Sequence, residues 1–368
     1  MRITKTGLKS IKNADIDIKN KKVILRTDFN VLVEKGKVTE GFRIEKSLPT
    51  IKFLKKKGAK IIIISHITES RGKSLAPAVE YLNKFEKAKL LGGILRRDVK
   101  KNISRMKNGD IVVLKNLRTD KREEKNDKIF SKKLAEIGDI YVNDAISVSH
   151  REHASVVGIT KYLPSYAGFL FKDELENLSK ALKPKHPFLL ILGGIKFGTK
   201  LKVLEKFIKI ADKIFVGGAL ANNFFKAQGK DIGNSIVDDK VSIKRYLNNP
   251  KIILPIDVRK SNNVILDAGP KTIKMLSKFI KKSKFILWNG PLGNFEKKGF
   301  EKGTESLARE LAKSKAEVIV GGGDSVAVID KLDLMKKFHF VSTAGGAMLE
   351  FLAQGTLPGI EALKKSKK

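Results

Sequence analysis

The chain has 368 residues, of which 42% are hydrophobic, which is enough to bury a core in each of two domains and argues against intrinsic disorder. It contains no cysteine, which excludes disulfides and thiolate chemistry, and no apolar run approaches the ~20 residues that a transmembrane helix needs. The N-terminal stretch lacks the apolar core of a signal peptide, so we expect a cytoplasmic protein.

The formal net charge is +36, from 75 Lys and Arg against 39 Asp and Glu. Such a charge would attract nucleic acid or acidic lipid, and it would also speed the capture of phosphorylated metabolites. The excess lysines are scattered over predicted helices and chain ends, as at 55–57 and 364–368, without interleaved aromatic residues. We therefore favour charge spread over solvated surfaces. Nucleic acid is expected to bind only nonspecifically, by electrostatic attraction.

Apolar segments rich in Ile and Val alternate along the chain with segments of helical periodicity. Strands are predicted within 21–30, 59–69, 109–118, 138–145, 187–194, 212–218, 284–293 and 316–325, and helices within 47–58, 129–138, 201–212 and 303–314. Strands that alternate with helices of this length indicate parallel sheets covered on both faces. The predicted fold class is α/β, with two doubly wound, Rossmann-like parallel-sheet domains.

The strands of the two halves end on different kinds of residue. Strands of the first half end on polar or charged side chains, namely Asp28, Asn30, His66, Arg118, Asn143 and Asp144. Strands of the second half end on glycine, at Gly193–Gly194, Gly217–Gly218, Gly290, Gly321–Gly323 and Gly345–Gly346. Ligands of open α/β sheets bind beyond the carboxyl ends of the strands. The first half is therefore predicted to bind a small anion through Arg and His, and the second half to bind nucleotide phosphates through backbone N–H groups.

A long helical stretch between Pro164 and Pro184 marks the expected domain boundary. We expect a first domain at 1–165 that also takes the C-terminal tail of about 350–368, a hinge helix at 166–183, and a nucleotide-binding domain at 184–349. Closure about such a helix would bring the two halves together and exclude water, as phosphoryl transfer requires.

The stretch ILGGIKFGTK at 191–200 places Lys196 and Lys200 four residues apart, directly after a predicted strand. It differs from a P-loop, because Thr199 precedes Lys200 where the P-loop has Lys followed by Ser or Thr. Taken alone, the two lysines are as consistent with a solvated helix face as with a phosphate clamp.

Ordered blocks along essentially the whole chain resemble the phosphoglycerate kinase family. They are RTDFNV (26–31), FRIEKSLPTIKFL (42–54), SH (65–66), EEKND (123–127), YVNDA (141–145), HREHAS (150–155), ILGGIKFGTK (191–200), FFKAQG (224–229), DAGPKTI (267–273), WNGPLGNFE (288–296), GGGDS (321–325) and STAGGA (342–347). The resemblance implies a monomeric glycolytic kinase that transfers a phosphoryl group reversibly between 1,3-bisphosphoglycerate and ADP, giving 3-phosphoglycerate and ATP. It also implies Mg²⁺ bound with ATP or ADP, and no membrane.

The resemblance also implies a role for individual residues. The 3-phosphoglycerate site would be lined by Asp28, Asn30, Arg43, His66, Arg118 and Arg151. The catalytic groups would be Arg43, Lys196, Gly345 and Gly346, of which Lys196 would follow the transferred phosphoryl group. The nucleotide site would comprise Gly194, Lys200, Gly218, Asn289, Pro291, Glu296, Gly322, Gly323, Asp324 and Ser325. Within it Glu296 would bind the ribose, and Asp324 would bind Mg²⁺.

Some positions depart from the family pattern and keep two alternatives open. Glu69, in SHITESRGK, falls in a loop that usually carries an arginine for the substrate, and Arg71 is the candidate replacement. Ile265 stands where a glycine is usual near the base, and Ala344 replaces the first glycine of a Gly-Gly-Gly run. The first alternative is a relative with altered acid or nucleotide preference. The second is a catalytically weak basic protein that binds anions or nucleic acid.

Overall fold

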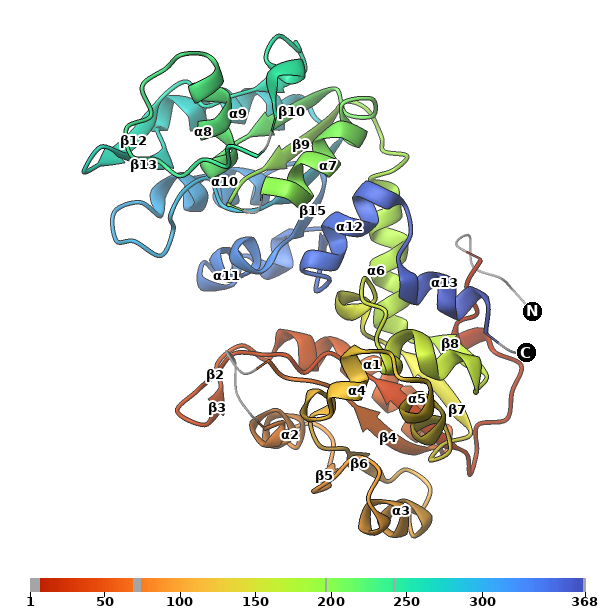
Figure 1. Cartoon of the computed structure of the whole chain (residues 1–368). Coiled ribbons are helices and arrows are strands. Elements are labelled where there is room, and N and C mark those ends of the chain that lie inside the picture. The colour runs from red at the N-terminus through yellow and green to blue at the C-terminus, as the bar shows by residue number, and fades with distance from the viewer. Residues whose placement is uncertain (1–6, 69–73, 196, 241, 367–368) are drawn as a thin grey trace. The chain divides into compact units, whose positions relative to one another are not determined.

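The chain divides into two units, each built around one parallel sheet, in the computed structural model (Figure 1). The structure describes residues 7–68, 74–195, 197–240 and 242–366. Unit 1 comprises Met1–Glu176 together with Thr356–Lys368, and unit 2 comprises Asn177–Gly355. The division after Glu176 lies inside α6 (Phe169–Lys180), the helix that occupies the segment for which a hinge is predicted.

Unit 1 contains a six-stranded sheet in the order β5-β6-β4-β1-β7-β8, in which every neighbouring pair is parallel. Its strands are β1 (Lys22–Arg26), β4 (Lys60–Ile64), β5 (Lys89–Leu90), β6 (Ile111–Val113), β7 (Ile140–Asn143) and β8 (Ser165–Ala167), with a separate hairpin of β2 (Val33–Glu34) and β3 (Lys37–Val38). Its helices are α1 (Phe42–Lys56), α2 (Ala76–Leu82), α3 (Arg97–Ser104), α4 (Lys121–Glu124), α5 (Lys128–Ala135) and α13 (Pro358–Lys364).

Unit 2 contains a second six-stranded parallel sheet, in the order β11-β10-β9-β14-β15-β16. Its strands are β9 (Phe188–Leu192), β10 (Lys213–Val216), β11 (Ile252–Ile253), β14 (Phe285–Asn289), β15 (Glu317–Gly321) and β16 (Phe340–Val341), with a separate hairpin of β12 (Val258–Ser261) and β13 (Val264–Ala268). Its helices are α7 (Phe197–Phe207), α8 (Gly218–Ala227), α9 (Pro270–Lys282), α10 (Lys302–Ala312), α11 (Gly323–Lys331) and α12 (Gly346–Gln354).

The central strands β9 and β14 are buried along their whole length, and β1, β4 and β15 are buried except at their first residue, because helices pack against the sheets. In unit 2, Phe188 of β9 meets Phe207 and Phe285 edge-on, with ring centroids 5.9 and 5.2 Å apart. Trp288 of β14 is 0% exposed and donates its ring N–H to the carbonyl of Gly290 at 2.8 Å. The single tryptophan is therefore a core residue.

The winding direction reverses at one strand of each sheet. In unit 1, β1 lies between β4 and β7, and in unit 2, β9 lies between β10 and β14. Ligands of doubly wound sheets bind at the carboxyl ends of the strands next to such a reversal. The residues that follow these strands are the ones singled out by the sequence, and the predicted α/β fold class is confirmed.

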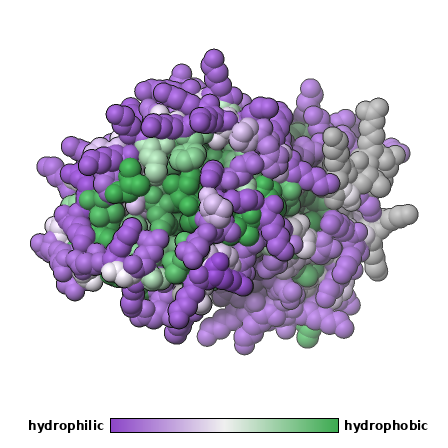
Figure 2. Space-filling view, turned by 90° about the horizontal axis from the view of Figure 1, so that it is seen from above, coloured by the Kyte–Doolittle hydropathy of each residue, from purple (hydrophilic) through white to green (hydrophobic). Residues whose placement is uncertain are grey.

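Hydrophilic side chains surround an apolar area on the face shown in Figure 2. Many of the excess lysines lie in exposed positions, including Lys56 and Lys57 at the end of α1 and Lys281 and Lys282 at the end of α9. Within the part of the chain that the structure describes, no helix is long and apolar enough to cross a bilayer.

Candidate active site

Asp28, which follows β1, holds the guanidinium of Arg43 at the start of α1. Its Oδ2 lies 2.5 Å from Nη1 of Arg43 and accepts the hydroxyl of Ser147 at 2.6 Å, while its Oδ1 accepts the N–H of Asn30 at 3.0 Å. Burial alone would raise the pKa of Asp28, but the charge of Arg43 and the hydrogen bonds from Ser147 and the N–H of Asn30 bring it down to about 2. The carboxylate is therefore ionised at neutral pH, and it fixes the direction in which Arg43 points.

His66 follows β4 and lies among several guanidinium groups. Its Nδ1 is 3.2 Å from Nη2 of Arg26, and only 3% of the residue is exposed. Burial lowers the pKa of His66 well below its ordinary value, and the charges of Arg26, Arg118 and Arg151 lower it further against the opposing effect of Asp28. His66 is therefore neutral at physiological pH and can donate or accept a hydrogen bond without adding charge.

Arg118, in the short 3₁₀ helix Leu117–Thr119, and Arg151, in the loop after Ser149, face the same cluster. Burial lowers the pKa of Arg118, and the neighbouring charge of Arg151 lowers it further, so the two guanidiniums repel each other. Glu124 offsets this in part, with its Oε1 3.3 Å from Nε of Arg118. Arg151 donates from Nε to Nε2 of His150 at 3.2 Å. Two half-buried cations held close together are suited to an anion that carries several charges.

Sequence reasoning missed Arg26 and the groups that hold it. Arg26 ends β1 and is 1% exposed, and its Nε donates to Oγ of Ser155 at 3.0 Å. Ser155 in turn donates to Oε1 of Glu123 at 2.5 Å and gives its N–H to Oε2 at 3.0 Å. Burial raises the pKa of Glu123, and Arg26 opposes that rise. The available signal was an arginine at the end of an otherwise apolar buried strand.

The structure brings the predicted residues of unit 1 into one polar cluster. Asn30 belongs to it through its N–H, which Asp28 accepts at 3.0 Å, and the Oδ1 of Asn30 accepts the N–H and the hydroxyl of Thr68 at 3.1 and 3.2 Å. Glu69 and Arg71, on which the altered-acid alternative depends, lie outside the described residues. The cluster joins the ends of β1 and β4 to α1 and to the segments that carry Arg118 and Arg151.

Glycine loops pack against one another at the carboxyl ends of β9, β10 and β14. Gly194, Gly218 and Gly290 all have positive φ, at 76°, 59° and 93°. Gly194 donates its N–H to the carbonyl of Pro291 at 2.7 Å, and Gly218 donates to that of Leu292 at 3.1 Å. A Cβ at position 218 would collide with the backbone of Gly194, and one at 290 with the backbone of Gly193. These positions require glycine for both space and conformation.

Lys200 lies beside this arrangement, in the first turn of α7. It is 4% exposed, and a Cβ built at Gly194 would lie 2.9 Å from its Nζ. A lysine that is largely buried next to a glycine loop is not part of a solvated helix face, so the solvated alternative does not hold for Lys200. Lys196, the other predicted clamp residue, lies outside the described residues.

Further glycines precede α11 and α12. Gly322 and Gly345 have φ of 96° and 56°, directly before the helix starts at Gly323 and Gly346. Ala344 is buried and does not adopt positive φ, so its replacement of the usual glycine is tolerated. Ser325 accepts the N–H of Gly290 at 2.8 Å through its Oγ, and it therefore positions that loop. Asn289, 4% exposed, precedes the same glycine at the end of β14.

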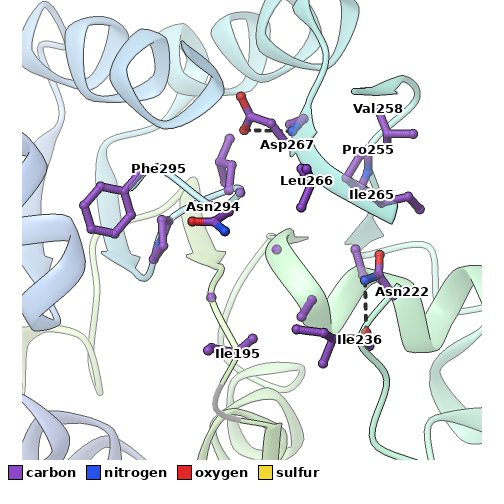
Figure 3. Close-up of a pocket in the computed structure, with 18 of the residues that line it drawn as sticks. Ile195, Asn222, Ile236, Pro255, Val258, Ile265, Leu266, Asp267, Asn294 and Phe295 are labelled. Atoms are coloured by element: carbon purple, nitrogen blue, oxygen red, sulfur yellow. Dashed lines mark hydrogen bonds between the residues drawn. The ribbon is translucent and has the colours of Figure 1, made fainter. Parts of the chain in front are cut away.

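A cavity of about 370 Å³ in unit 2 opens next to these loops (Figure 3). Predicted nucleotide residues that line it are Gly194, Gly218, Pro291, Glu296 and Asp324, and the remaining ones lie in the loops and helix turns beside it. Its other walls are largely apolar and include Ile236, Pro255, Val258 and Ile265. Sequence reasoning noted Ile265 but missed the other three, because they come from segments without a strand-end signal.

No group of three or more His, Asp or Glu side chains that could hold a metal ion exists among the described residues. Asp324 is instead a single exposed carboxylate at the mouth of the cavity. One carboxylate is the contribution expected from a protein that binds Mg²⁺ mainly through the phosphates of a nucleotide and through water. The residues present therefore fit a nucleotide-bound Mg²⁺ better than a permanent metal centre.

Comparison with known proteins decides the family. The family model described as phosphoglycerate kinase matches residues 13–355. The chain belongs to the phosphoglycerate kinase family. It is 40% identical to the phosphoglycerate kinase of Dictyoglomus turgidum, over 95% of this chain and 97% of that one, and 39% identical to that of Pseudothermotoga lettingae, over 98% and 100%.

Solved structures of the family share the fold. Phosphoglycerate kinase from Pyrococcus horikoshii OT3 has a TM-score of 0.86 at 30% identity, covering 97% of this chain and 98% of that one. The Coxiella burnetii enzyme has a TM-score of 0.80 at 34% identity, covering 98% and 100%. The predicted glycolytic activity and enzyme class are confirmed: the chain is an ATP/ADP-dependent phosphotransferase that acts on a carboxyl group and takes small-molecule substrates. Nothing in these comparisons supports either alternative.

Proposed function

We propose that unit 1 binds phosphoglycerate through its arginine cluster, and that unit 2 binds Mg²⁺ with ATP or ADP at its glycine loops. The observation that carries the proposal is the gathering of Arg26, Arg118 and Arg151 around the neutral His66 at the carboxyl end of the unit 1 sheet. A phosphorylated carboxylic acid supplies the multiple negative charge that such a cluster lacks.

In unit 1, Arg118 and Arg151 are proposed to contact the phosphate and carboxylate oxygens of the acid, with His66 and Asn30 donating hydrogen bonds to them. Arg43, held by Asp28 at 2.5 Å, is proposed to reach the carboxyl end at which the phosphoryl group is transferred. Fixing this guanidinium before substrate binds reduces the reorganisation that the transition state would otherwise require.

In unit 2, Lys200 and the backbone N–H groups around Gly194, Gly218 and Gly322–Gly323 are proposed to bind the nucleotide phosphates. Asp324 is proposed to hold Mg²⁺, which when bound neutralises phosphate charge as the phosphoryl group moves. Glu296, exposed at the cavity, is proposed to accept hydrogen bonds from the ribose hydroxyls.

The two substrates must meet for direct transfer, so we propose that the chain closes about α6, with domain boundaries as expected from the sequence. Gly345 and Gly346 begin α12, and the N–H groups there are suited to the transferring phosphoryl group. Lys196 is proposed to follow that group. A monomer in the cytoplasm also stays a prediction, as does nonspecific binding of nucleic acid.

A coupled assay with MgATP and 3-phosphoglycerate tests the proposal when wild type is compared with Lys200→Ala and Lys202→Ala. Lys200 is buried at the glycine loop and Lys202, two residues on, is exposed. Loss of a charge-assisted hydrogen bond to phosphate should raise the KM for MgATP at least about tenfold in Lys200→Ala. Lys202→Ala should match wild type. Absence of turnover from folded wild-type protein would refute the proposal.

A further inference from the structure

Two adjacent asparagines of α8 differ in how their side-chain oxygens are used. In Asn223 both polar atoms of the side-chain amide have a hydrogen-bond partner. Its Nδ2 donates to the carbonyl of Asp238 at 2.8 Å, and its Oδ1 accepts the Asp238 N–H at 3.3 Å. Asn222 is 2% exposed and donates from Nδ2 to the carbonyl of Ile236 at 3.0 Å. Its Oδ1 is buried and has no hydrogen-bond partner among the described residues.

The chemistry of the Ile236 contact fixes the orientation of the Asn222 amide. A backbone carbonyl can only accept, so the NH₂ group of Asn222 must face Ile236, and the Oδ1 must face the other way. Figure 3 shows Asn222, which belongs to α8, with its dashed bond running to Ile236. The free acceptor is therefore a property of this packing, and a buried acceptor without a partner calls for an explanation.

Asn222 also lines the 370 Å³ cavity of unit 2. Next to it the cavity walls form an apolar slot of Ile236, Pro255, Val258 and Ile265, and other polar side chains of the lining include Asp267 and Asn294 (Figure 3). Small-molecule sites are usually lined mainly by apolar side chains, with a few polar groups that fix the orientation of the ligand. The base of a nucleotide whose phosphates lie at the glycine loops would occupy this slot.

We propose that Asn222 determines the base preference of the nucleotide site, with its Oδ1 accepting a hydrogen bond from the 6-amino group of adenine. The inference rests on the proposed nucleotide site and deepens it. An acceptor needs a donor, and the 6-amino group is the one donor that adenine offers once N9 carries the ribose. Hypoxanthine and guanine carry an oxygen at position 6, which would place one acceptor against another.

Access to the oxygen requires a small movement of the cavity wall. Asn222 is almost fully buried, so a base reaches its Oδ1 only if a neighbouring side chain moves aside. Ile265, which lines the cavity and is only partly buried, has room to change rotamer. The Asn222–Ile236 hydrogen bond lies on the opposite side of the amide, so such a movement leaves it intact.

The first test uses the unmodified protein and three diphosphates measured by calorimetry in the presence of Mg²⁺. ADP should bind about fivefold more tightly than purine riboside 5′-diphosphate, which lacks the amino group, and IDP should bind no better than the latter. Equal affinity for ADP and purine riboside 5′-diphosphate overturns the inference. Failure of ADP itself to bind would instead contradict the proposed nucleotide site.

The second test compares Asn222→Ala with its neighbour Asn223→Ala. Both residues anchor the segment that contains residues 236 and 238, but only Asn222 lines the cavity and has a side-chain oxygen without a hydrogen-bond partner among the described residues. Asn222→Ala should lose the preference for ADP over purine riboside 5′-diphosphate, and Asn223→Ala should retain it. Loss of the preference in both variants would assign the effect to the anchored segment and overturn a direct role for Asn222. If a variant fails to fold, the comparison of the three diphosphates on the unmodified protein still tests the inference.

Discussion

Units 1 and 2 are both built on six-stranded parallel sheets, and in both the winding reverses beside the first strand of the unit. The residues at the carboxyl ends differ, however. After β1 and β4 stand Asp28 and His66, with several arginines around them, whereas β9, β10 and β14 are followed by glycines of positive φ. The same sheet geometry can therefore present side chains to a ligand in one unit and backbone N–H groups in the other.

The two solutions carry different energetic costs. Unit 1 buries charged groups, including Arg26, Asp28 and Glu123, and holds them with hydrogen bonds or an opposite charge. Unit 2 buries fewer charges near its loops but places backbone segments so close together that a Cβ cannot be accommodated at Gly218 or Gly290. Unit 1 should therefore be sensitive to loss of a charge, and unit 2 to addition of a methyl group.

The largest effect is expected from Arg26→Ala in unit 1. The substitution removes the cation that most strongly opposes the raised pKa of the buried Glu123, and it also removes the donor to Ser155. The free energy of unfolding should therefore fall by about 3–5 kcal/mol. Urea unfolding followed by circular dichroism measures this loss. Trp288, the only tryptophan, lies in the core of unit 2. The urea midpoint that its fluorescence reports should therefore shift less than the midpoint for unit 1.

Arg122→Ala is the matched control for Arg26→Ala. Arg122 pairs with Asp120 at 2.7 Å on the surface, where an ion pair contributes about 1 kcal/mol or less. If Arg26→Ala lowers the free energy of unfolding no more than Arg122→Ala does, the buried charge network does not stabilise unit 1.

Gly218→Ala should be the next largest change, and it acts on unit 2. Position 218 combines positive φ with a collision against Gly194, so we expect a loss of about 3 kcal/mol together with weaker ADP binding. Gly229→Ala separates the two causes, because φ there is 74° but nothing lies within 4 Å of the added Cβ. That variant should lose only about 1 kcal/mol. Unfolding followed by Trp288 fluorescence measures both losses. If Gly218→Ala and Gly229→Ala lower the free energy of unfolding equally, the close approach of position 218 to Gly194 does not contribute to the loss.

The smallest effect is a pH dependence in unit 1. Burial raises the pKa of Asp144 to about 7, so between that value and its lower pKa in the unfolded chain the folded state holds a proton that the unfolded state has released. Raising the pH through this interval therefore destabilises the fold. Relative to Asp144→Asn, which does not titrate, wild type should lose about 2 kcal/mol between pH 5 and pH 7. A constant difference in unfolding free energy across this range would contradict the assigned shift.

Much of the fold was predictable because its main strands are continuous apolar runs. All of the segments predicted as strands contain one, including β1, β4, β9 and β14. Strands such as β5, β11 and β16 were missed because two residues are too few to show a pattern. The β12–β13 hairpin was also missed, although Asn262 and Asn263, both with positive φ, form the kind of turn that asparagine favours.

The candidate site was predictable where chemistry falls at a strand end. His66, Asp28 and the glycine loops satisfy that condition, and they lie at the carboxyl ends of the strands in the two sheets. Glu123 was missed because it lies in the charged run KREEK, which is typical of a solvated helix, although it is 1% exposed. Asn222 was missed because its free oxygen results from how α8 packs against the segment at 236–238, and a local pattern does not reveal such packing.

The most direct test of the account measures the binding of 3-phosphoglycerate and of MgADP separately, by calorimetry, to wild type, Arg118→Ala and Lys200→Ala. Arg118→Ala should weaken the acid at least about tenfold and leave MgADP unchanged, and Lys200→Ala should do the reverse. Such a reciprocal pattern would assign the acid to the arginine cluster of unit 1 and the nucleotide to the glycine loops of unit 2. Equal weakening of both ligands by either variant, or weakening of the opposite ligand, would contradict that division.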